Sequence, residues 1–124
     1  MGARILIVDD DPINLELVCY ALRHAGYVIE KAVNAEQAEE LLKRVTPDLI
    51  LMDLALPGVD GLTLTRKLKS DERLKSVPIV AFSALAANWD QEEALQAGCI
   101  GYIDKPIDID QFPRQVAAFF LTQQ

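Results

Sequence analysis

Charged or hydroxyl residues follow four of the short apolar runs in this chain. They are the aspartates Asp9, Asp10 and Asp11, then Asp53, Ser83 and Lys105. A carboxylate surrounded by a divalent cation, an ammonium group and a hydroxyl can attack phosphorus, because those three groups stabilise the phosphoryl oxygens. The residue types therefore predict phosphoryl transfer, with Asp53 as the nucleophile and an aspartyl phosphate as the product. Lys105 would supply the ammonium group and Ser83 the hydroxyl.

The carboxylates of Asp9, Asp10 and Asp53 repel one another if they are brought together. Two carboxylates about 4 Å apart repel by roughly 1 kcal/mol in water, and by about 4 kcal/mol at an effective dielectric constant near 20. A proton or a cation has to offset this repulsion. Mg²⁺ or Mn²⁺ suits carboxylate and water ligands without histidine or thiolate. The acidic residues therefore predict a site for a divalent metal ion.

The apolar runs themselves predict the strands of a parallel sheet. The runs are residues 5–8, 49–52 and 79–82, with weaker ones at 28–29 and 100–103. Continuous apolar runs are typical of strands that are covered on both faces. These five strands alternate with five helix-length stretches, which predicts an α/β fold with a doubly wound sheet. Such sheets carry their sites at the carboxyl ends of the strands, where the polar residues named above would meet.

Helical spacing and capping residues predict the helices. They are expected from Ile13 to just before Gly26, from Ala35 to Val45, from Gly61 to Lys69, from about Ala86 to Ala97, and onward from about Asp110. Asp11 and Asn34 are the expected caps of the first two helices. In the first helix, Ile13, Leu17 and Ala21 recur at four-residue spacing, and Val18 and Leu22 lie next to them in the sequence. These five residues form the predicted apolar face of the helix.

Composition excludes several classes of function. The 124 residues include 12 Lys and Arg against 19 Asp and Glu, so the net charge of −7 argues against binding to nucleic acid or to an anionic membrane. No apolar stretch approaches the roughly 18 residues of a membrane helix. Cys19 and Cys99 form no C-x-x-C motif and are expected to be buried apolar residues. His24 is the only histidine, which excludes sites that need two. We expect a soluble, cytoplasmic domain.

With these residues in hand, the whole chain resembles the receiver domain of two-component response regulators, the CheY-like family. The motifs that carry the resemblance are Ile5–Asp11 (ILIVDDD), Asp48–Gly61 (DLILMDLALPGVDG), Pro78–Ala84 (PIVAFSA) and Ala97–Pro106 (AGCIGYIDKP). Within the family, the runs Ala84–Ala86 and Lys105–Asp108 are similar to those of two groups. These groups are the single-domain regulators of the DivK type and the receivers of hybrid histidine kinases. The resemblance implies one receiver domain over residues 1–124, with five strands in the order 2-1-3-4-5 and five flanking helices.

The resemblance also implies roles for single residues at the metal and phosphorylation site. Asp53 would accept a phosphoryl group from a histidine kinase or a histidine phosphotransfer protein. Asp9 and Asp10 would hold Mg²⁺, directly or through water, together with Asp53 and the backbone carbonyl of Ala55, and Mn²⁺ could substitute. Lys105 would pair with the phosphoryl oxygens, and its peptide bond to Pro106 is expected to be cis.

Two further residues would form the switch that the family uses. Ser83 stands at the switch hydroxyl and Tyr102 at the switch aromatic residue. In such domains these side chains move toward the phosphorylated site and reshape the surface of the fourth helix, fifth strand and fifth helix, which binds a downstream protein. Ala55 and Leu85 are apolar where the family has side chains that act on the hydrolytic water, so we expect slow loss of the phosphate.

Other interpretations of the same residues remain open at this point. Asp9–Asp11 could be an acidic helix terminus favoured by the helix dipole, Asp53 a turn residue, and Tyr102 an ordinary strand aromatic. A phosphatase of the haloacid dehalogenase type also uses an aspartate nucleophile and Mg²⁺, but Ala55 stands where that family has a second aspartate. A flavin or nucleotide carrier lacks its glycine-rich loop here. A receiver that signals without phosphate would not need the full set of polar residues.

The sequence also bears on organisation and partners. It predicts a signalling switch that acts through protein contacts, and no conventional enzyme. The chain ends about one helix after Lys105, so we expect either a stand-alone regulator or a receiver excised from a hybrid protein. A monomer and a dimer that forms on phosphorylation are both compatible with the sequence.

Overall fold

In the part of the chain that the structure describes, five short strands form one parallel sheet in the spatial order β2-β1-β3-β4-β5. The computed structural model describes residues 2–56, 60–83, 88–104 and 107–122, apart from the side chains of residues 83, 88–90 and 121–122. The strands are β1 (Arg4–Val8), β2 (Val28–Ala32), β3 (Leu49–Asp53), β4 (Ile79–Ser83) and β5 (Gly101–Asp104). This order and the parallel pairing confirm the predicted doubly wound sheet.

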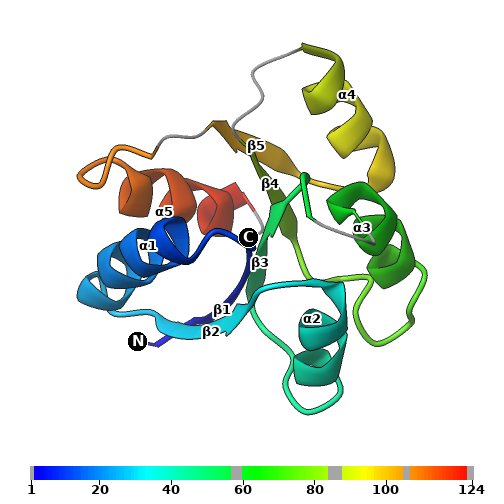
Figure 1. Ribbon diagram of the computed structural model, residues 1–124, viewed down its shortest axis with the longest axis horizontal. Helices are drawn as coiled ribbons and strands as arrows, with labels where there is room; N and C mark the ends of the chain where they lie inside the picture. Colours follow the sequence, from blue (N-terminus) through cyan, green and yellow to red (C-terminus); the bar gives the residue numbers. More distant parts are fainter. Residues whose placement is uncertain (1, 57–59, 84–87, 105–106, 123–124) are drawn as a thin grey trace.

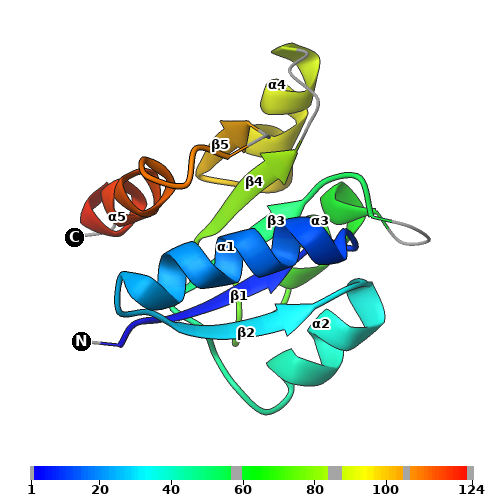
Figure 2. The ribbon, with the colours of Figure 1, turned by 60° about the vertical axis from the view of Figure 1, so that its left-hand side comes forward.

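Helices cover both faces of the sheet. They are α1 (Pro12–His24), α2 (Ala35–Leu42), α3 (Gly61–Lys69), α4 (Asn88–Ala97) and α5 (Phe112–Thr122). The helices α1 and α5 lie on one face, and α2, α3 and α4 lie on the other (Figures 1 and 2). Among the described helices, none combines the length and the apolar character needed to cross a lipid bilayer.

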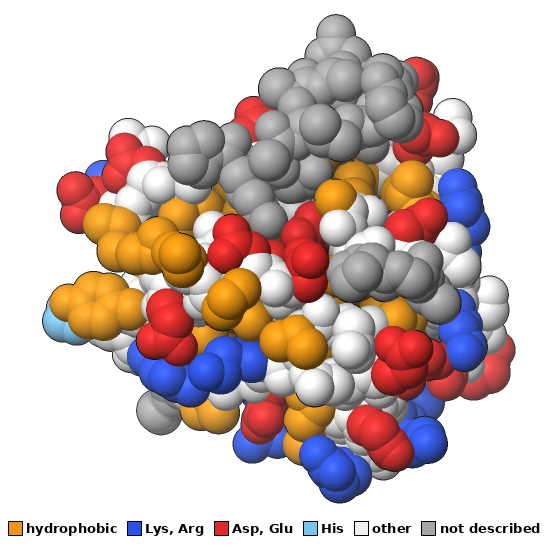
Figure 3. Space-filling view, in the orientation of Figure 1, with side chains coloured by type: hydrophobic (Ala, Val, Ile, Leu, Met, Phe, Trp, Pro, Cys, Tyr) orange, Lys and Arg blue, Asp and Glu red, His pale blue; other side chains and the backbone are white. Residues whose placement is uncertain are grey.

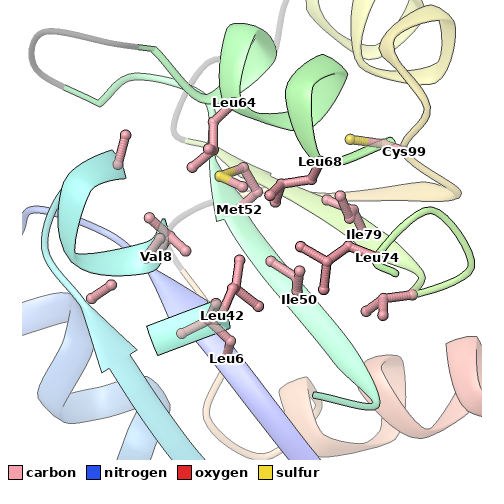
Figure 4. Close-up of a cluster of buried hydrophobic side chains, with 14 of the residues drawn as sticks. Leu6, Val8, Leu42, Ile50, Met52, Leu64, Leu68, Leu74, Ile79 and Cys99 are labelled. Atoms are coloured by element: carbon pink, nitrogen blue, oxygen red, sulfur yellow. The ribbon is translucent and has the colours of Figure 1, made fainter. Parts of the chain in front are cut away.

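The alternating sides of each strand supply two separate hydrophobic clusters. Leu6, Ile50 and Ile79 point to the face covered by α2, α3 and α4, where they pack with Leu42 and Leu64 (Figure 4). Their neighbours along the strands, among them Ile5, Leu51 and Val80, pack on the other face with residues of α1 and α5. Both sides of the central strands are therefore buried, which explains why their sequences are continuously apolar.

Two helix ends differ from the prediction, and hydrogen bonds explain both. α2 ends at Leu42 and not at Val45, because the guanidinium of Arg73 donates to the Leu42 carbonyl and, at 2.8 Å, to the hydroxyl of Thr46. α5 begins at Phe112 and not near Asp110, since the backbone and side chain of Asp108 first accept bonds from the turn that leads into the helix. For α4 the described helix begins at Asn88, and residues 84–87 lie outside the description.

The predicted apolar face of α1 was partly wrong. Val18, Ala21 and Leu22 are buried as expected, but Ile13 is 74% exposed and Leu17 is 44% exposed. The buried side is completed instead by Leu15 and Cys19, at the i, i+3, i+4 and i+7 spacing of a single helix face. The sequence carries two overlapping apolar stripes, and packing against the sheet selects one of them. The other remains exposed together with Tyr20, whose ring stacks on His24. Exposed hydrophobic side chains are visible over α1 in Figure 3.

Both cysteines are free and buried, as predicted, and we expect them to be unreactive in the folded protein. Burial raises the pKa of the Cys99 thiol to about 11, so only roughly one thiol in a thousand is ionised at pH 8. Burial also raises the pKa of Cys19. Iodoacetamide at pH 8 should leave the mass of the native protein unchanged and should add two carbamidomethyl groups in urea. Alkylation of Cys99 at the same rate with and without urea would contradict this description of the core.

Candidate functional site

The register between β1 and β3 places two of the predicted site residues side by side. Val8 pairs with Met52, so Asp9 and Asp53 leave neighbouring strands at the same level of the sheet. Asp9 is completely buried and the side chain of Asp53 is almost so, whereas Asp10 is exposed. One carboxylate oxygen of each of these three residues lies within 4.8 Å of the others. Figure 3 shows acidic side chains gathered near the centre of the view, where β1 and β3 lie in Figure 1.

The carboxylate of Asp9 is held by hydrogen bonds at both of its oxygens. Its Oδ1 accepts from the backbone N–H of Asp11 at 2.9 Å, and its Oδ2 accepts from the side-chain amide of Asn14 at 2.6 Å. Its own backbone N–H donates to the carbonyl of Ala32 on β2 at 3.0 Å. Asp11 also caps α1, as predicted, by accepting from the backbone of Ile13 at 3.0 Å. Asp9 is therefore fixed by the strand, by the turn and by the helix that follows it.

Asp53 is held by a turn of the same kind. Its Oδ1 accepts from the backbone N–H of Ala55 at 2.9 Å, two residues further along the chain. Ala55 itself is exposed, at the edge of the site. The predicted role of its carbonyl oxygen as a metal ligand stays a prediction.

Gly61 brings the start of α3 into contact with the backbone of Asp53. A Cβ atom at Gly61 would lie 2.2 Å from the carbonyl oxygen of Asp53 and 2.7 Å from the Cα of Leu54. The N–H of Gly61 donates to the Leu54 carbonyl at 3.2 Å, and Asp60 caps the helix by accepting from Thr63 at 2.8 Å. Only a residue without a side chain allows this approach, so Gly61 helps to fix the level at which Asp53 leaves the sheet.

The other predicted site residues are placed only in part. The backbone of Ser83 ends β4 and pairs with Asp104 on β5, and Tyr102 lies half-buried on β5, paired with Ala81. The side chain of Ser83, together with Lys105, Pro106 and Leu85, lies outside the described residues. The roles assigned to Ser83, Tyr102 and Lys105 stay predictions.

The three gathered carboxylates fit a hard divalent cation. They are oxygen ligands, they come from two adjacent strand ends, and two of the three are buried, where their mutual repulsion is weakly screened. Among the described residues, this cluster includes no histidine and no cysteine, whose imidazole and thiolate groups favour zinc or copper. The donor set suits Mg²⁺ or Mn²⁺, as the sequence predicted.

Sequence reasoning missed Asn14 and Gly61. Asn14 carried a usable signal: it is a polar residue on the same side of α1 as Leu15 and Val18, so its amide had to find a buried partner. Gly61 also carried one, since glycine is the residue used where the backbone of another segment comes close. The partners of both residues became visible only when the elements were placed in space.

Comparison with known proteins reveals one family. The family model for the response regulator receiver domain matches residues 5–117. The chain is 36% identical over 119 residues to the polar-differentiation response regulator DivK of Brucella anthropi, covering 96% of this chain and 97% of that protein. It is 38% identical over 115 residues to the DNA-binding dual master transcriptional regulator RpaA of a Synechocystis species, covering 93% of this chain. The chain spans about half of the length of RpaA, 48%.

A solved structure matches the fold as well as the sequence. It is the receiver domain of the sensor histidine kinase PA1611 from Pseudomonas aeruginosa, with a TM-score of 0.85 and 36% sequence identity, covering 95% of this chain and 97% of that one. In that structure a magnesium ion is coordinated in the active site cleft.

The contact at Gly61 predicts that Gly61→Ala will move the strand end as well as destabilise the protein. The added methyl group meets backbone atoms that cannot turn away, so we expect a loss of about 1–3 kcal/mol in the free energy of unfolding. Urea unfolding measures this loss, and the amide resonances of Asp53 and Leu54 report on the displacement. Gly26→Ala is a matched control, because Gly26 has a φ of +102° but no neighbour within 4 Å. It should lose a similar amount of stability while leaving those two resonances in place. Unchanged resonances in Gly61→Ala would contradict the contact.

Proposed function

The chain belongs to the family of response regulator receiver domains, and we propose that Asp53 is the residue that accepts its phosphoryl group. Receiver domains are signalling proteins that take phosphoryl groups from kinases and act on downstream targets. The observation that carries the assignment to Asp53 is the gathering of its carboxylate with those of Asp9 and Asp10 at the ends of β3 and β1. The resemblance in sequence and the geometry of the described residues support the same aspartate.

The proposed reaction is a direct displacement at phosphorus. A carboxylate oxygen of Asp53 forms a bond to phosphorus while the bond from phosphorus to the donor breaks. When the donor is a phosphohistidine, the imidazole nitrogen keeps the bonding electrons and takes up a proton; when it is acetyl phosphate, acetate leaves. The bond that Asp53 accepts from Ala55 orients the carboxylate before the donor arrives. The domain would promote only its own phosphorylation and dephosphorylation.

Asp9, Asp10 and Asp53 are the side chains that would hold the cation, with the carbonyl of Ala55 as a further proposed ligand. Bound Mg²⁺ neutralises charge on the phosphoryl oxygens and on the crowded carboxylates. Mn²⁺ is proposed to substitute, since it accepts the same oxygen ligands. Lys105, which follows Asp104 in the sequence, is proposed to pair with a phosphoryl oxygen.

The proposed output is a change in the surface of α4, β5 and α5. Ser83 ends β4, and Tyr102 lies on the neighbouring strand β5. A movement of Ser83 toward the phosphoryl group would therefore change the surroundings of Tyr102. Tyr102 is half-buried and packs against the cluster beneath α2, α3 and α4. Phosphorylation would then favour one arrangement because that arrangement makes additional contacts to the phosphorylated site.

We assign the approach of the protein phosphodonor to the exposed side of α1. This helix begins at Pro12, directly after the site aspartates, and exposes Ile13, Leu17 and Tyr20. A hollow of about 410 Å³ lies between Tyr20 and the segment before α5, and its lining includes His24, Ile109 and Asp110. A donor histidine must come within bonding distance of Asp53, so the protein that carries it would cover this neighbouring surface.

The remaining parts of the proposal concern organisation and location. We propose that residues 1–124 form one receiver domain that acts in the cytoplasm on a protein target, as a monomer or as a dimer that forms on phosphorylation. The net charge of −7 supports a protein target over nucleic acid.

Acetyl phosphate and Mg²⁺ provide the direct test of the phosphoacceptor. We expect mass spectrometry to show one added phosphoryl group on the wild-type protein and none on Asp53→Asn, because an amide oxygen is a far weaker nucleophile than a carboxylate. Asp48→Asn is a matched control, since Asp48 precedes the same strand and its carboxylate accepts from the backbone of Arg4 at the opposite end. Its phosphorylation should be unimpaired. Phosphorylation of Asp53→Asn at the wild-type rate, or turnover of phosphate esters by the wild-type protein, would overturn the proposal.

The apolar residue types at positions 55 and 85 predict a long-lived phosphate. Ala55 is exposed beside Asp53 and cannot orient or activate a water molecule, and the same holds for the side-chain type of Leu85. We expect the radiolabelled phosphoprotein to decay over minutes or longer. In Ala55→Asn an amide is available to bind the attacking water, and we expect faster decay. Loss of the label from the wild-type protein within seconds would contradict this prediction.

A further inference from the structure

Asn14 is a buried polar residue that the proposed reaction does not use directly. It is the third residue of α1 and its side chain is only 8% exposed. Its amide nitrogen, Nδ2, donates to Oδ2 of the fully buried Asp9 at 2.6 Å. The contact is short and charge-assisted, and it joins the first helix to the end of the first strand.

The bond from Asn14 determines how the carboxylate of Asp9 is turned. A carboxylate with one hydrogen bond can still rotate about its Cβ–Cγ bond. Asp9 accepts a bond at each oxygen, from Asp11 to Oδ1 and from Asn14 to Oδ2, and two fixed oxygens define the plane of the group. A carboxylate oxygen carries two lone pairs, so one that accepts a hydrogen bond can also bind a cation.

The chemistry of the amide also matters at this position. A lysine or arginine here would satisfy Asp9 but would cancel its charge and weaken the attraction for a cation. Asn14 donates a hydrogen bond and leaves the negative charge in place. Its own position is set by the same turn, because Asp11 accepts from the backbone of Asn14 at 3.4 Å and from that of Ile13 at 3.0 Å.

We propose that Asn14 is a positioning residue for the divalent cation, acting through the carboxylate of Asp9. The inference rests on the proposed function, since it assumes the cation held by Asp9, Asp10 and Asp53. Part of the affinity for the metal ion would then depend on Asn14, in the first turn of α1. Partners that orient the ligands of a metal ion raise the affinity for it, and their loss costs roughly 10- to 100-fold.

Asn14→Leu tests the proposal, because leucine has a similar volume and no hydrogen-bond donor. Titration with Mn²⁺, followed by electron paramagnetic resonance, measures affinity without any phosphoryl transfer. We expect the dissociation constant to rise about tenfold. In phosphorylation by acetyl phosphate, the Mg²⁺ concentration at half-maximal rate should rise by the same factor, while the rate at saturating Mg²⁺ should change by less than about twofold.

Arg73→Met is the control for a general loss of stability. Arg73 bonds the end of α2 and Thr46 and takes no part in the acidic site, so this variant should be destabilised with an unchanged affinity for Mn²⁺. If Asn14→Leu does not fold, Asn14→Ser replaces it, because the shorter side chain cannot span the distance to Oδ2.

The outcomes separate the two proposals. If the wild-type protein binds no Mn²⁺, the metal site itself is wrong. If the wild-type protein binds Mn²⁺ and the Asn14 variant binds it equally tightly, the metal site stands and the role of Asn14 is overturned. A variant that loses stability at unchanged affinity would likewise reduce Asn14 to a structural residue. A tenfold weaker affinity, relieved by saturating Mg²⁺, would support the inference.

Discussion

The repulsion among three carboxylates is the constraint on which the rest of this structure depends. One oxygen from each of Asp9, Asp10 and Asp53 lies within 4.8 Å of the others. Two carboxylates about 4 Å apart repel by roughly 1 kcal/mol in water and by about 4 kcal/mol at an effective dielectric constant near 20. Burial of Asp9 and Asp53 weakens the screening by water and so strengthens the repulsion between them. A flexible chain would relieve the repulsion by moving the groups apart. The fold prevents this, and the stored repulsion makes the site attract a cation.

Rigidity at the site comes from the way the strands are buried. Both faces of β1 and β3 are covered, so neither strand can shift along its neighbour without exposing apolar side chains to water on two sides. At the ends of the strands, two matching turns complete the restraint. Asp9 and Asp53 each accept a hydrogen bond of 2.9 Å from the backbone N–H two residues later. The helices that follow, α1 and α3, then anchor those turns through Asn14 and Gly61.

Much of the fold could be predicted because its signals are local. Continuous apolar runs identify strands buried on both faces, and the residues Asp11 and Asn34 identify helix starts by their own side chains. The errors occur where distant segments decide the outcome. The end of α2 depends on Arg73, which lies 31 residues beyond Leu42 in the chain. The exposed position of Ile13 depends on which of two apolar stripes of α1 the sheet accepts.

For the site, the sequence by itself determined which acidic residues gather at one edge of the sheet. Acidic residues directly after apolar strands can only gather at the carboxyl edge of a parallel sheet, so Asp9, Asp10 and Asp53 followed from their order in the chain. The tertiary structure alone decided how those residues are held. The donation from Asn14 to Asp9 and the approach of Gly61 to Asp53 depend on the angle and depth at which each helix packs on the sheet. Such angles arise from the contacts of many side chains at once, and no single stretch of sequence contains them.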